Sequence, residues 1–166
     1  MANTYEAERA PALREHTHWK TAAWAGVAGG VVFLVMEMML VWLALGESPW
    51  APPRMMAAMV MGQQALPPPA PFHAVIVAVA MLVHFALSVA YGVLLGWIVH
   101  RMGMGLALLT GAVFGLVAVY LVNFHLIAPA VFPWFTMAQN WVSVLSHVVF
   151  GLVVAGVYVA YRDRHA

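Results

Sequence analysis

The chain has 166 residues, of which 64% are hydrophobic and 8% are charged, and its mean hydropathy is +0.89. This composition excludes a water-soluble globule, because so much apolar surface could not be kept away from water, and it predicts an integral membrane protein. The net charge of +1 gives no reason to expect a nucleic-acid partner, and the absence of cysteine excludes disulfides, thiolate-bound clusters and a cysteine nucleophile.

The first 21 residues are polar and lack the apolar core and cleavage site of a secretory signal, so we expect a retained cytoplasmic N-terminal segment. Residues 22–161 follow as one transmembrane domain with four apolar windows, each near the length of about 20 residues that a spanning helix needs. The windows are residues 22–45, 73–99, 106–127 and 141–161, and residues 162–166 form a short cytoplasmic tail. The predicted fold class is therefore all-α, a polytopic membrane protein with four transmembrane helices.

The first window contains Glu37, the sole Asp, Glu, Lys or Arg inside any of the four windows. An ionisable group at membrane depth is costly unless it faces the protein interior or a wet cavity and finds a partner there. Glu37 is therefore the first candidate for a functional site, and His84 and His147 in the second and fourth windows are candidate partners.

The loop of residues 46–72 follows the first window and contains an expected helix of its own. Pro52 and Pro53 suit the first turn of a helix, and the good helix formers after them carry Met55, Met56 and Met59 toward one side. We expect a short helix lying in the membrane interface, ended by the proline run at residues 67–69.

The basic residues predict the orientation of the four spans. Arg54 lies in the loop of residues 46–72, whereas the other six lysines and arginines flank the windows on the side of the two termini. Because basic residues gather on the cytoplasmic side, both termini are expected in the cytoplasm.

Small and polar residues share one face in three of the windows, which predicts that these faces pack together. At about 1.5 Å per residue, the three titratable side chains on these faces would lie in the outer half of the membrane. We expect Asn123, His125, Asn140 and Ser143 to surround them. The faces comprise Gly26, Gly30, Phe33 and Glu37; His84, Ser88, Gly92 and Gly96; and Asn140, Ser143, His147 and Gly151.

Two cofactor chemistries fit these side chains. Glu37, His84 and His147 together would make a metal site for Zn, Fe, Mn or Cu, and the many methionines at this level would favour copper. His84 and His147 alone could hold a b-type haem between facing helices. The leading hypothesis is a protein that binds a metal or haem in the outer leaflet.

Other interpretations stay open. The polar layer could be purely structural, holding helices in register in an accessory subunit of a respiratory or photosynthetic complex. It could also belong to a small transporter or channel that works as an oligomer, or to a quinone site. In each case the lipid bilayer is a partner, and a homo-oligomer or a larger membrane complex is expected. The sequence identifies no catalytic residue.

A loose internal repeat suggests that the bundle is a tandem pair of helical hairpins. Gly26 and Gly30 in the first window correspond to Gly111 and Gly115 in the third, and a Pro-Trp pair follows each window. His84 and His147 would then be equivalent residues, related by an axis along the membrane normal.

Several segments also carry a resemblance to a known family. They include GVAGGVVFLVMEMML, GESPWAPPRMMAAMVMG, LVHFALSVAYG, LVNFHL, FPWF and SHVVFG. With these segments the chain resembles a family of small four-helix bacterial inner-membrane proteins, some of which carry a sodium:proline symporter label. The resemblance implies the fold but no substrate or cofactor.

Overall fold

The computed structural model describes residues 17–66 and 68–162, and the helices within them confirm the predicted all-α membrane fold. Four helices are long and apolar enough to cross a membrane, and each lies within a few residues of a predicted window. They are α2 (Trp19–Leu45), α4 (Ala74–Val99), the continuous helix built from α5 (Met104–Phe114), η2 (Gly115–Ile127) and α6 (Ala128–Val131), and α7 (Trp141–Arg162). The chain is thus a multi-pass membrane protein.

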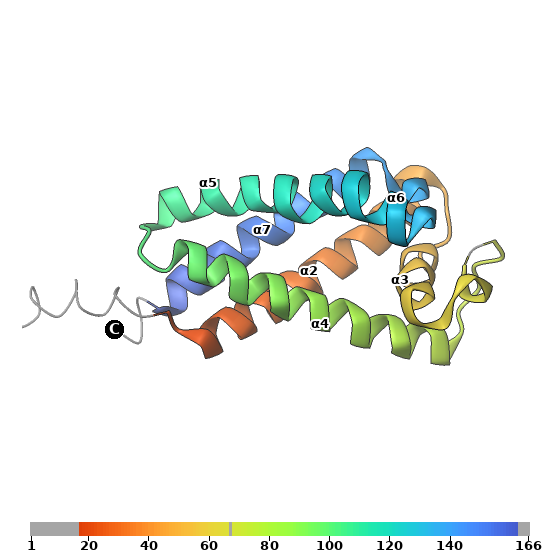
Figure 1. Cartoon of the computed structure of the whole chain (residues 1–166), viewed down its shortest axis with the longest axis horizontal. Coiled ribbons are helices and arrows are strands. Elements are labelled where there is room, and N and C mark those ends of the chain that lie inside the picture. The colour runs from red at the N-terminus through yellow and green to blue at the C-terminus, as the bar shows by residue number, and fades with distance from the viewer. Residues whose placement is uncertain (1–16, 67, 163–166) are drawn as a thin grey trace, which may run out of the picture.

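The spans are packed as two crossing pairs. α2 packs against both α4 and α7, and α5 and η2 pack against α7. α4 and α5 meet at a tight turn and then diverge toward the opposite end of the bundle (Figure 1). The start of α2 and the end of α7 lie at the same end as that turn, as expected for four antiparallel crossings. Residues 1–16 and 163–166 of the predicted cytoplasmic segments lie outside the described residues.

Glycines allow the backbones of each pair to meet. A Cβ added at Gly26 of α2 would lie 3.1 Å from Gly92 Cα of α4 and would overlap the Ser88 carbonyl oxygen. A Cβ at Gly151 of α7 would likewise overlap the Gly111 carbonyl oxygen of α5. Small residues at helix crossings are what close packing in membranes requires. Both hairpins place glycines at their crossing, but the tandem repeat itself stays a prediction.

Arg162 closes the end of the bundle at the α4–α5 turn. Its buried guanidinium donates to the carbonyl oxygens of Val99 at 3.4 Å, His100 at 2.6 Å and Met102 at 3.1 Å. Carbonyl groups at a helix C-terminus have no hydrogen-bond partner within the helix, so the guanidinium group satisfies them. Its positive charge also interacts favourably with the negative end of the α4 dipole. The last residue of α7 therefore fixes the turn between the second and third spans.

The loop after α2 folds back over the other end of the bundle. Its helix α3 (Ala51–Met61) has Pro52 and Pro53 in its first turn, as predicted, but ends at Gly62, where φ is +85°, before the proline run. α3 packs against α4 and buries Met55, and the Trp134 indole of η3 (Pro133–Ala138) donates to the Met55 carbonyl oxygen at 3.2 Å. Helix α3 and η3 together cover this end of the bundle, and we call them the roof.

Candidate intramembrane pocket

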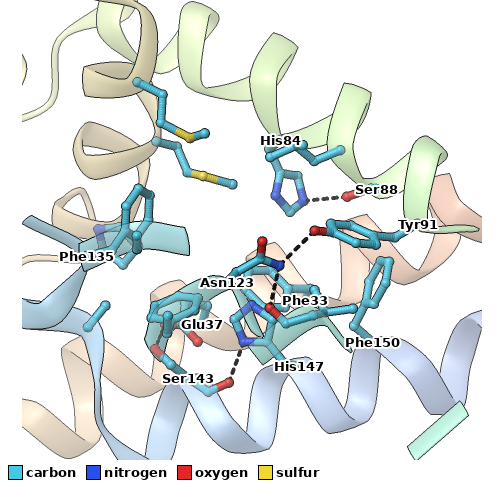
Figure 2. A pocket seen from close by; sticks show the side chains of 18 of the residues that line it. Phe33, Glu37, His84, Ser88, Tyr91, Asn123, Phe135, Ser143, His147 and Phe150 are labelled. Atoms are coloured by element: carbon cyan, nitrogen blue, oxygen red, sulfur yellow. Dashed lines mark hydrogen bonds between the residues drawn. The ribbon is translucent and has the colours of Figure 1, made fainter. Parts of the chain in front are cut away.

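A pocket of about 190 Å³ lies beneath this roof, lined by side chains from all four spans (Figure 2). A water needs roughly 10–15 Å³ by this kind of measure, so the pocket has room for a small molecule rather than a single solvent molecule. Its lining is mostly apolar and aromatic. The residues are Phe33, Glu37, Pro52, Met56, Met59, His84, Leu87, Ser88, Tyr91, Val119, Asn123, Phe124, Ile127, Ala128, Phe132, Phe135, Ala138, Ser143, His147 and Phe150.

Glu37 reaches this pocket from the middle of α2. Its side chain is 5% exposed, and Oε1 accepts a hydrogen bond of 2.8 Å from the Ser143 hydroxyl of α7. Oε2 is buried without a hydrogen-bond partner, and Ser146 faces the carboxyl without forming a hydrogen bond of ordinary geometry. A buried polar group normally has every hydrogen-bonding atom satisfied, so the Glu37 carboxyl retains an unused acceptor.

The two imidazoles have matching environments. His84 Nε2 donates to the Gly30 carbonyl oxygen at 2.9 Å, and His147 Nδ1 donates to the Ser143 carbonyl oxygen at 2.6 Å. A neutral imidazole that donates through one nitrogen presents a lone pair at the other. Within the described chain, neither His84 Nδ1 nor His147 Nε2 has a hydrogen-bond partner. Each imidazole is thus oriented by the backbone and keeps one free acceptor.

Aromatic rings fill the space around these groups. The Phe33 ring stacks on His84 with a centroid separation of 5.5 Å and meets His147 edge-on at 4.7 Å. Phe124 and Phe150 complete the cluster on the side of α7, with Phe124 at 5.2 Å from His147 and Phe150 at 6.5 Å from Phe33. The single residue Phe33 therefore contacts both imidazoles and couples their positions.

The third span differs from a regular α-helix where it borders the pocket. Residues Gly115–Ile127 have the wider hydrogen-bonding pattern of a π-helix, a form that is often found at functional sites. Within it, Asn123 Nδ2 donates to the Val119 carbonyl oxygen and to the Tyr91 hydroxyl of α4, both at 2.7 Å. This amide bridges the two spans that diverge in Figure 1.

The structure brings most of the predicted site residues to the pocket. Glu37, His84, His147, Asn123 and Ser143 all line it. Asn140 instead starts α7, where its Oδ1 accepts from the backbone N–H groups of residues 142 and 143 at 3.0 and 3.2 Å. His125 is exposed and its ring meets Tyr120, so it does not join the pocket lining.

A metal set of Glu37, His84 and His147 is not assembled in this arrangement. In residues 17–66 and 68–162, no group of three or more His, Asp or Glu side chains is placed to hold one ion. The three side chains share a pocket, with the Phe33 ring against both imidazoles and the carboxyl bonded to Ser143.

Sequence reasoning missed several lining residues. Tyr91 is three residues beyond Ser88 and shares its helical face, so the same spacing could have identified it. Phe135 of η3 comes from the roof, whose fold over the pocket has no periodic signal in the sequence. Met56 and Met59, expected on one side of the short helix and at this level, do line the pocket.

Comparisons with protein-family models, curated proteins and solved structures give no match to this chain. The resemblance to small four-helix inner-membrane proteins therefore stays a prediction, as do the bacterial inner membrane and the cytoplasmic position of the termini.

Proposed function

We propose that this protein binds a small amphipathic amine in its intramembrane pocket, with the Glu37 carboxylate as the partner of the ammonium group. The observation that carries the proposal is the unused Glu37 oxygen, which is buried at the wall of an apolar cavity without a hydrogen-bond partner. An acid at membrane depth is stabilised by a partner of opposite charge, and among the described residues the side chains in contact with the Glu37 carboxyl are serines rather than cations.

The other polar groups of the pocket also favour a ligand that donates hydrogen bonds. His84 and His147 each use their N–H on a backbone carbonyl and have an acceptor left over. The Asn123 amide nitrogen is already engaged by Tyr91 and Val119. On Glu37, His84 and His147, the atoms left unpaired are therefore acceptors, which suit an ammonium group.

The aromatic lining supplies the rest of the recognition. Phe33, Phe124 and Phe150 surround the polar groups, and ring faces attract a cation by about 0.5–2 kcal/mol, most strongly where water is excluded. The same rings provide an apolar surface for a hydrocarbon body. A protonated amine attached to a small apolar group satisfies both features.

Equilibrium binding of radiolabelled 2-phenylethylamine to the protein in lipid nanodiscs tests the proposal. The amine should bind with one site per chain, and the uncharged isostere 2-phenylethanol should compete poorly. Glu37→Gln keeps the side-chain shape and should weaken binding by about 30-fold or more, because losing one partner of a buried charge pair costs at least about 2 kcal/mol.

Glu47→Gln is the matched control, since Glu47 is exposed and lies outside the pocket lining, and it should leave the affinity unchanged. Equal binding of the amine and the alcohol, or unchanged binding by Glu37→Gln, would show that the carboxylate does not select the ligand.

A b-type haem or a metal ion is the second candidate, and the orientation of the imidazoles favours it. Histidines that bind metals commonly donate their other N–H to a backbone carbonyl, as His84 and His147 do. The pocket volume of about 190 Å³ is below the roughly 300–1,000 Å³ of typical ligand sites, so a macrocycle would require the helices to separate. Metal analysis and an absorption spectrum of the purified protein distinguish this candidate, and haem absorption should disappear in His84→Ala or His147→Ala.

A further inference from the structure

One side of the pocket is less tightly closed than the others. α4 packs closely against α2 and α3, and η2 packs against α7, but α4 and η2 are not a closely packed pair. The polar contact that joins α4 to η2 is the hydrogen bond between Tyr91 and Asn123. The roof, by contrast, is closed by the Trp134 indole on Met55.

The residues along this side belong to the pocket and to the lipid-facing surface at once. Leu87, Tyr91 and Asn123 line the pocket and are half-buried, and Ile127 lines it while being 46% exposed. The deep wall is different, because Glu37, His84, Ser143 and His147 are all buried. Exposure therefore increases from the carboxyl toward the gap between α4 and η2, which lies along the spans and faces the bilayer.

We infer that the ligand is an amine with a long apolar tail, whose ammonium binds at Glu37 while its tail leaves the pocket between α4 and η2 into the lipid. This inference rests on the proposed amine-binding function and adds the class of amine and its route. An opening toward the acyl chains removes the need to enclose such a tail within the cavity of about 190 Å³.

The Tyr91–Asn123 hydrogen bond is placed to control this opening. Figure 2 shows this bond as a dashed line from Asn123 to Tyr91, and Asn123 lies in the π-helical segment. Hydrogen bonds between membrane helices average only about 0.6 kcal/mol, so breaking this one is inexpensive. Tyr91→Phe keeps the ring against Phe114 and removes the hydroxyl, so we expect it to speed amine entry.

Competition by butylamine and dodecylamine against radiolabelled 2-phenylethylamine in nanodiscs tests the inference, after correction for partition into empty nanodiscs. Dodecylamine should compete at least as well as butylamine. Ile127→Trp narrows the opening and should weaken the binding of dodecylamine by about tenfold, which corresponds to an overpacking cost of about 1.4 kcal/mol. The affinity for butylamine should stay the same.

Leu126→Trp is the matched control, because Leu126 is the exposed neighbour of Ile127 and does not line the pocket. It should leave both amines unchanged. Binding of butylamine without dodecylamine, or equal loss of both in Ile127→Trp, overturns the tail route while leaving the proposed function intact. If butylamine, dodecylamine and 2-phenylethylamine all fail to bind the unmodified protein, the proposed function itself is wrong. Displacement of dodecylamine by phosphatidylethanolamine, itself an amine with long apolar tails, would support the tail route and identify a lipid headgroup as the source of the ammonium group.

Discussion

At the scale of single residues, the pocket depends on how each polar atom is satisfied. Glu37 has one hydrogen bond, from Ser143, and Ser146 is a second buried serine of α7 whose hydroxyl has no partner. The two serines have the same chemistry, the same helix and nearly the same burial, at 1% and 0% exposed. They differ in whether the hydroxyl bonds the carboxyl, which makes them a matched pair for measuring that bond.

Ser143→Ala should destabilise the protein by about 1–3 kcal/mol, because it leaves a buried carboxyl with neither oxygen bonded. Ser146→Ala removes an unpartnered hydroxyl and should change the free energy of unfolding by less than about 0.6 kcal/mol, the average value of an interhelical hydrogen bond in membranes. Unfolding in mixed SDS micelles measures both variants. Equal effects of the two substitutions would show that the Ser143–Glu37 bond does not stabilise the fold.

At the scale of helices, the arrangement of the spans depends on where two backbones touch. Gly26 meets α4 at Gly92, whereas a Cβ added at Gly156 of α7 would make an ordinary van der Waals contact, with Leu108 Cδ2 at 3.4 Å. Both glycines lie in the interior of a helix, so alanine has the same intrinsic advantage at each. The difference between them isolates the requirement for close helix contact.

Gly26→Ala should destabilise the protein by about 1–3 kcal/mol, because the new methyl group would overlap the Ser88 carbonyl oxygen, a rigid backbone atom. Gly156→Ala should be neutral or stabilising by up to about 1 kcal/mol, the helix-propensity difference between the two residues. Thermal unfolding in detergent gives both values. A stable Gly26→Ala variant would mean that α2 and α4 can separate without loss.

At the scale of the whole molecule, the ends of the bundle are unequal. One end has the α4–α5 turn held by Arg162, and the other has the roof of α3 and η3 over the pocket. The distribution of basic residues predicts that the pocket end faces away from the cytoplasm, which would place the carboxyl in the outer half of the membrane.

Single cysteines test that orientation cleanly, because the chain contains no cysteine of its own. Gln64→Cys, which follows α3 at the pocket end of the bundle and is exposed, should react with a membrane-impermeant thiol reagent in intact cells. Gly103→Cys, in the α4–α5 turn where an added Cβ meets open space, should react only after the cells are permeabilised. The reverse labelling pattern would show that the protein has the opposite orientation, with the pocket in the inner half of the membrane.

The sequence by itself determined the fold class and the spans, since an apolar run near 20 residues has few alternatives to a membrane helix. It also singled out Glu37, His84 and His147, because polar side chains in apolar windows stand out against their neighbours and share faces with glycines. These inferences depend on properties that lie within one helix, so reading along the chain was sufficient.

The tertiary structure decided which groups share a pocket and what each one bonds. The rotation and crossing of separate helices determine that Ser143 bonds Glu37 and that Phe33 contacts both imidazoles. They also determine that His125 is exposed and lies outside the pocket. The roof of α3 and the gap between α4 and η2 likewise depend on contacts between segments far apart in sequence. Periodicity specifies the faces of each helix, but the partner of each face is chosen by packing, which no single segment encodes.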